Sequence, residues 1–224
     1  MVQKLVSPYK EGMLICGYKV KPYEKDHGYT HFGIDLKAVY KKSSDRNIYA
    51  SGLGVVISAG KDNNLGYCFC INYPQCLMHD GEVKNICVKY MHCKKSYVKV
   101  GEVVTKESLI AIEGKEGCED YHVHFEVDTD LVNPRYTPQC KTSNYWIHGY
   151  DSTLNPTLFL YNTDERKLVE SNYNASYLNE GDKIKNIPTT EITDYGVKVN
   201  QCVDDVEEDL NKALNDLARI RKLV

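Results

Sequence analysis

Two segments of this chain carry side chains that suit a divalent metal ion. His31 and Asp35 lie four positions apart in a segment whose glycines disfavour a stable helix. Far downstream, His122 and His124 alternate within a strand-like run, so their side chains project from the same face, roughly 6.5 to 7 Å apart along the chain. Imidazole and carboxylate groups are both zinc ligands, so one downstream histidine can bind an ion while the other stands beside it over a substrate.

A third histidine, His92, ends the apolar strand-like segment 88–92. Taken singly, each of these histidines is better explained as a structural or surface residue, because His-x-His and His-x-x-x-Asp patterns are common by chance. Taken together, in this order and with glycine turns between them, the three segments are much more specific. They predict one site that is built from distant parts of the chain.

The ordered segments resemble the lysostaphin-like, or LytM-type, zinc endopeptidases, which cut the peptide part of bacterial peptidoglycan. The resemblance extends from about residue 17 to residue 160, roughly two thirds of the chain. It is carried by residues 30–35, 50–56, 90–92, 100–104, 112–114 and 121–127. This resemblance implies a mainly β fold, an antiparallel β-sheet domain with a substrate groove.

The resemblance also implies roles for five residues. His31, Asp35 and His124 would bind Zn²⁺, and three protein ligands leave a fourth position open for catalysis. His92 and His122 would flank the attacking water, where an imidazole can accept a proton, stabilise the oxyanion or protonate the leaving amine. The division of these tasks between His92 and His122 stays open.

Three further features bear on the predicted site. Glu126 lies two positions beyond His124 on the same strand face, so it can either support a ligand imidazole or serve a purely structural partner. Segment 117–121 is acidic and aromatic where the resembling family usually has small residues, which would narrow the groove or change the peptide that fits. The aromatic stretch 135–150 is either a groove wall or a packed loop.

The elements that must position these groups are short strands. From about residue 14 to residue 160, strand-like runs are separated by Gly, Asn, Asp and Pro turns, which predicts a mainly antiparallel β fold. We divide the chain into a peptidase domain at 1–165, an irregular linker or extension at 166–202, and an amphipathic helix at 203–224. The helix has coiled-coil spacing, and docking on its own domain and self-association are equally favoured.

Composition limits the partners of the chain. A net charge of -3 gives no basic field for nucleic acid, and no apolar run is long enough to span a membrane.

The N-terminus lacks a secretory signal pattern, and nine cysteines in a chain without such a signal predict mostly reduced thiols. We interpret Cys68, Cys70, Cys76, Cys87 and Cys93 as small core residues, with Cys93 on the face opposite its neighbour His92. His27 is expected in a loop.

The leading hypothesis is therefore a zinc-dependent endopeptidase that hydrolyses peptide bonds of peptidoglycan. A zinc peptidase of the D-alanyl-D-alanine type is disfavoured, since its metal-binding His and Asp are usually further apart than His31 and Asp35. A non-catalytic scaffold on the same fold is the alternative from another class. A protein made in the cytoplasm without a signal would reach the cell wall as a phage lysin or as part of a phage tail.

Overall fold

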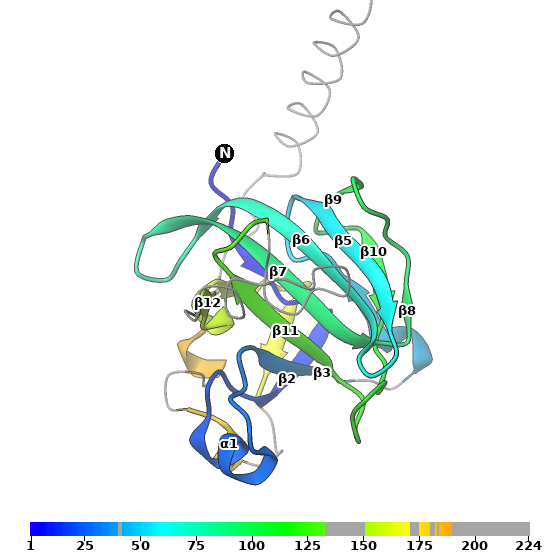
Figure 1. Cartoon of the computed structure of the whole chain (residues 1–224). Helices are drawn as coiled ribbons and strands as arrows, with labels where there is room; N and C mark the ends of the chain where they lie inside the picture. The colour runs from blue at the N-terminus through cyan, green and yellow to red at the C-terminus, as the bar shows by residue number, and fades with distance from the viewer. Residues whose placement is uncertain (40–41, 133–150, 171–174, 180–181, 183, 190–224) are drawn as a thin grey trace, which may run out of the picture. The chain divides into compact units, whose positions relative to one another are not determined.

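A nine-stranded sheet forms the centre of the protein in a computed structural model (Figure 1). The strands of the whole structure are β1 (Leu5–Val6), β2 (Glu11–Cys16), β3 (Ile34–Ala38), β4 (Asn47–Tyr49), β5 (Gly54–Asp62), β6 (Gly66–Leu77), β7 (Val83–Cys93), β8 (Lys95–Ser96), β9 (Val103–Val104), β10 (Leu109–Ile112), β11 (Val123–Asp128), β12 (Thr153–Leu154), β13 (Leu160–Tyr161) and β14 (Lys167–Val169). The helical elements are α1 (Lys21–His27) and the 3-10 turns η1 (Ser43–Arg46), η2 (Pro156–Leu158), η3 (Ala175–Tyr177) and η5 (Ile184–Asn186). The structure describes residues 1–39, 42–132, 151–170, 175–179, 182 and 184–189.

The order of strands in the large sheet is β14-β2-β3-β11-β7-β6-β5-β9, and β12 pairs with β11. Every pairing in this sheet is antiparallel except that of β14 with β2. A three-stranded antiparallel sheet, β4-β10-β8, and the parallel pair β1-β13 complete the strands of the described region. The predicted fold class, mainly antiparallel β, is confirmed.

Aromatic side chains from the central strands fill the core. The rings of Phe69 and Tyr90 stack with centroids 4.9 Å apart, and Phe125 meets Tyr90 edge-on at 5.2 Å. Both arrangements are favourable for aromatic quadrupoles. The hydroxyl groups of Tyr73 and Tyr90 lie 3.0 Å apart, so these buried phenols satisfy one another. The five cysteines interpreted as core residues are all buried free thiols.

The segment after residue 165 contributes to this core. Arg166 is buried, and its guanidinium donates to the carbonyl oxygens of Ser7, Lys106 and Ala50 at 2.7, 2.7 and 3.0 Å. Strand β14 then pairs with β2 at the edge of the large sheet. All described residues belong to one compact unit, Met1–Thr190. The part of the predicted extension that the structure describes is therefore folded onto the sheet.

Two predicted features lie outside the described residues. They are the helix at 203–224 and the aromatic stretch at 135–150. Among the described helices, none combines the length and the apolar character that crossing a membrane requires.

Candidate active site

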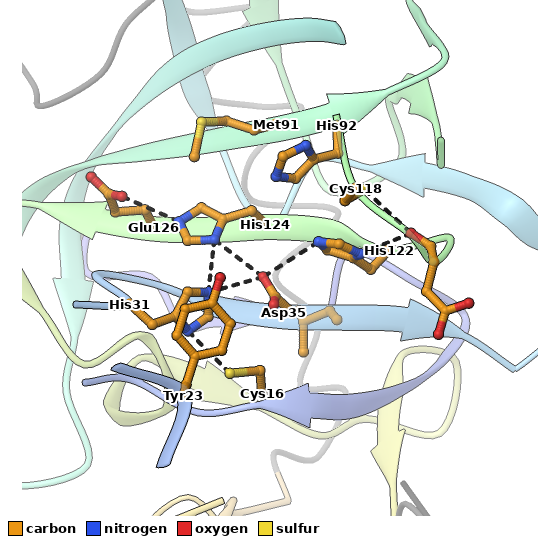
Figure 2. A network of polar contacts seen from close by, with 12 residues as sticks. Cys16, Tyr23, His31, Asp35, Met91, His92, Cys118, His122, His124 and Glu126 are labelled. Atoms are coloured by element: carbon orange, nitrogen blue, oxygen red, sulfur yellow. Dashed lines mark hydrogen bonds and ion pairs between the residues drawn. The ribbon is translucent and has the colours of Figure 1, made fainter. Parts of the chain in front are cut away.

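The register of three neighbouring strands brings two predicted ligands together. Strand β11 lies between β3 and β7, and His124 on β11 is directly paired with Asp35 on β3. Residues directly opposite in an antiparallel pair have side chains within contact distance on the same face. His31 lies three residues before β3 begins, and its side chain points toward the same spot (Figure 2).

The three predicted ligands converge in a triangle. His31 Nε2 lies 3.0 Å from His124 Nδ1, and Asp35 Oδ1 lies 3.1 Å from each of these two nitrogens. The three residues are only 3 to 7% exposed. Tetrahedral zinc with ligands at 2.0–2.1 Å places neighbouring ligand atoms about 3.3 Å apart. The three side chains therefore fit a zinc ion after an outward movement of a few tenths of an ångström.

The partners of His31 orient its ring for this role. The carbonyl oxygen of Gly17 lies 2.8 Å from His31 Nδ1, and Cys16 Sγ lies 3.3 Å from the same nitrogen. A carbonyl can only accept, so Nδ1 carries the hydrogen and Nε2 faces Asp35 and His124. Burial lowers the pKa of His31, but the Asp35 carboxylate outweighs it and raises the pKa above its ordinary value. Burial likewise opposes charge on Asp35, yet His31 and His122 hold the pKa of Asp35 well below its usual range.

His124 is supported by a buried ion pair that links β11 with β7. Glu126 Oε2 lies 3.2 Å from His124 Nε2, and Glu126 Oε1 accepts from Lys89 Nζ at 2.9 Å. Burial disfavours the charged form of Glu126, but Lys89 and His124 lower its pKa to about 2. Glu126 is therefore a carboxylate at neutral pH, and it holds His124 with Nδ1 directed at the triangle. The predicted support of a ligand imidazole by Glu126 is thus present.

His92 and His122 stand beside the triangle with their rings 5.0 Å apart. Main-chain carbonyl groups of one loop hold both rings: Glu116 O lies 2.7 Å from His92 Nδ1, and Asp120 O lies 3.0 Å from His122 Nδ1. Burial, together with His122 and His124, lowers the pKa of His92 to about 4. The structure thus brings all five predicted site residues together.

A bulge in β7 directs His92 into the site. Tyr90 pairs with Phe69 and Cys93 with Tyr67, so β7 has one more residue than β6 between these pairs. His92 has a left-handed backbone with φ 65°, which non-glycine residues rarely adopt. Bulges often re-aim side chains next to active sites, and this one turns His92 toward the metal triangle. Cys93 is fully buried in the core.

An aromatic group covers one side of the triangle. The ring of Tyr23 from α1 lies 4.6 Å from that of His31, and its hydroxyl lies 2.8 Å from the hydroxyl of Tyr29. His27, which was expected in a loop, is the last residue of α1, because Gly28 ends the helix with φ 77°. Tyr177 from η3 packs against Tyr23 at 5.8 Å. These residues and the triangle line a cavity of about 690 Å³.

Sequence reasoning missed Lys89, Tyr23 and Cys16. Lys89 was visible as one charged residue within an otherwise apolar strand-like run, a pattern that indicates a buried partner of opposite charge. Tyr23 and Cys16 carried no such signal, because their place beside His31 depends on how α1 and β2 fold back on β3.

Comparison with known proteins identifies the part of the chain that carries the site. Residues 29–134 match the family model described as Peptidase family M23, and no curated protein matches the chain. Among solved structures, the SpoIIQ–SpoIIIAH pore forming complex aligns at 18% identity and TM-score 0.48, over 71% of this chain and 92% of that one. The antimicrobial peptidase lysostaphin from Staphylococcus simulans aligns at 20% identity and TM-score 0.44, over 70% and 52%.

A prophage-encoded M23 protein, EnpA from Enterococcus faecalis, aligns at 21% identity and TM-score 0.43, over 59% of this chain and 89% of that one. The family match spans all five residues of the candidate site, from His31 to His124. The part of the chain that carries the candidate site, residues 29–134, is therefore similar to Peptidase family M23.

Proposed function

We propose that this protein is a zinc-dependent endopeptidase that hydrolyses peptide bonds of bacterial peptidoglycan. The observation that carries the proposal is the triangle of His31 Nε2, Asp35 Oδ1 and His124 Nδ1, with edges of 3.0 to 3.1 Å, beside two further histidines. The similarity of residues 29–134 to a peptidase family supports the reaction class.

The chemistry of the donor set favours zinc. Two imidazoles and one carboxylate are a common set of protein ligands in catalytic zinc sites. Bound zinc would lower the pKa of a coordinated water towards about 7 and polarise the scissile carbonyl. In the protein, Gly17 O and Glu126 fix the tautomers of His31 and His124, so that the nitrogens in the triangle carry lone pairs.

His92 and His122 are poised for proton transfer. Because the carbonyl groups of Glu116 and Asp120 can only accept, each Nδ1 donates and each Nε2 carries a lone pair in the neutral ring. One Nε2 can accept a proton from the attacking water. The resulting imidazolium can stabilise the oxyanion and then protonate the leaving amine. The lowered pKa of His92, about 4, keeps this ring neutral and able to accept a proton at neutral pH.

The cavity beside the triangle suits an extended, polar peptide. Its wall includes tyrosines from α1 and η3 and the acidic loop that holds His92 and His122. Tyrosine offers a flat apolar face together with a hydroxyl, which fits a backbone rich in amide groups. The setting as a phage lysin or tail component stays a prediction.

The alternative of a non-catalytic scaffold predicts a different site. A protein that needs only the fold has no use for five buried polar side chains directed at one point. Here each of the five has a hydrogen-bonding or ionic partner that directs it. We therefore favour the enzyme.

The test combines zinc content with hydrolysis. We expect the purified parent, loaded with one equivalent of zinc, to retain that ion and to clear a peptidoglycan suspension with release of new amino termini. His31→Ala should lose both zinc and hydrolysis, whereas His92→Ala should keep zinc and lose hydrolysis. Equal clearing by all three proteins, or zinc lost equally from both variants, would contradict the assignment.

A further inference from the structure

The loop that holds His92 and His122 also places a cysteine beside them. Cys118 is half-buried, and its Sγ lies 3.3 Å from the carbonyl oxygen of Asp120, the same oxygen that accepts from His122 Nδ1 at 3.0 Å (Figure 2). One ligand atom from each of His92, Cys118 and His122 lies within 4.8 Å of the other two. This cluster adjoins the triangle, since His122 Nε2 lies 3.7 Å from Asp35 Oδ1.

We propose that His92, Cys118 and His122 form a second zinc site next to the one formed by His31, Asp35 and His124. Imidazole and thiolate are the two ligand types that zinc binds best, and three of them with an open position make a complete zinc site. This inference rests on the proposed function in one respect, because the neighbouring site is the one that is proposed there to bind the catalytic zinc.

The geometry needs a small adjustment. Zinc with Zn–N near 2.0 Å and Zn–S near 2.3 Å places a nitrogen and a sulfur about 3.6 Å apart. The upper limit of 4.8 Å between these ligand atoms therefore has to shrink by at most about 1.2 Å for a nitrogen and a sulfur and about 1.5 Å for two nitrogens. A rotation of the Cys118 side chain supplies a movement of this size, because this residue lies in a loop and not in a strand.

The surrounding charges favour a cation at this place. The carboxylates of Asp120 and Glu116 act electrostatically on the Cys118 side chain, and Lys115 opposes them. The two carboxylates attract a divalent ion, and zinc binding displaces the proton of a thiol. Asp35 is not counted in this balance, because it belongs to the neighbouring triangle.

A second ion at this place would inhibit hydrolysis. His92 and His122 each use Nδ1 for a main-chain carbonyl, so Nε2 is the nitrogen left for proton transfer in the proposed mechanism. An ion that binds through either Nε2 would occupy that lone pair. Zinc in excess should therefore act as an inhibitor, with Cys118 setting the concentration at which it does so.

The test counts ions and detects the sulfur ligand. The metal-free full chain is titrated with Zn²⁺ by equilibrium dialysis and, separately, with Co²⁺ while the near-ultraviolet sulfur-to-cobalt charge-transfer band is recorded. We expect two ions per parent chain and a band that grows with the second ion. Cys118→Ala should lose the band and bind the second ion at least about tenfold more weakly. The matched control is Cys76→Ala, which removes a buried thiol that does not line the cavity and should keep the band and both ions.

The outcomes separate this inference from the proposed function. One ion per parent chain without a sulfur band overturns the second site and leaves the first intact. A band that survives Cys118→Ala also overturns it, because another thiol then binds the ion. A parent that binds no ion at all overturns both sites. Thermal unfolding of each variant checks folding, and Cys118→Ser replaces Cys118→Ala should the latter unfold at the titration temperature.

Discussion

Two groups of side chains meet at the candidate active site, and the chain positions them in different ways. Asp35 and His124 stand on paired strands, and a buried carboxylate on the same strand supports His124. His92 stands at a strand bulge and His122 just before a strand, and the carbonyl groups of one loop hold both. The sheet therefore positions the group that we propose binds zinc, whereas a loop positions the group that we propose transfers protons.

This difference predicts that the two groups fail separately. Strand pairing fixes side chains through many hydrogen bonds, so damage to the loop should leave the metal-binding triangle in place. Damage to the triangle, in contrast, should remove zinc and with it the reaction. The following substitutions test that separation.

The largest effect is expected from Asp35→Ala. Loss of the one carboxylate in the triangle removes the negative charge that balances the zinc ion, and it leaves only two imidazole ligands. We expect zinc content and hydrolysis to fall to background. Elemental analysis of the dialysed variant measures the first, and release of amino termini from peptidoglycan measures the second. Retained stoichiometric zinc would exclude Asp35 as a ligand.

A large effect on turnover alone is expected from His122→Ala. Removal of a general acid or base typically lowers a rate by about 10²–10⁴-fold. Zinc supplied at one equivalent should stay bound as in the parent, because the triangle does not include this ring. The control is His79→Ala, whose imidazole lies 2.8 Å from Leu160 O, away from the cavity. Zinc loss in His122→Ala would show that the two groups are not separable.

An intermediate effect is expected from Glu126→Gln. The amide can still reach His124, but it lacks the charge that fixes the imidazole and pairs with Lys89 Nζ at 2.9 Å. We expect zinc affinity to fall about 10–100-fold. Loss of the buried ion pair with Lys89 should also lower the free energy of unfolding by about 3–5 kcal/mol. Competition with a chelator and chemical denaturation measure the two effects, and an unchanged affinity would contradict the role given to Glu126.

The smallest but most selective effects are expected from a pair of glycine substitutions. A Cβ at Gly33 would lie 2.6 Å from His124 Nε2, whereas a Cβ at Gly114 would lie 2.4 Å from His92 O. Overpacking of this kind costs about 1–3 kcal/mol. Gly33→Ala should weaken zinc binding, and Gly114→Ala should slow hydrolysis while zinc is retained. The same pattern of loss in both variants would count against separate control of the two groups.

The parts that strand periodicity governs were predictable from the sequence. Alternation in the run 121–127 placed His124 and Glu126 on one face, and the succession of short strand-like runs separated by turn residues gave the antiparallel fold class. Alternation could not predict the bulge at His92, because a left-handed histidine leaves no trace in a pattern of apolar residues. It also could not predict that the carbonyl groups of Glu116 and Asp120 hold the two histidines, since main-chain groups have no sequence signature.

The most direct test of the central claim is X-ray absorption at the zinc edge, on metal-free protein loaded with one equivalent of zinc. The account predicts two imidazole nitrogens and a carboxylate oxygen at about 2.0–2.1 Å, and no sulfur. Loss of the bound ion in His31→Ala should follow. A sulfur ligand near 2.3 Å at this loading would contradict the claim that His31, Asp35 and His124 form the primary site.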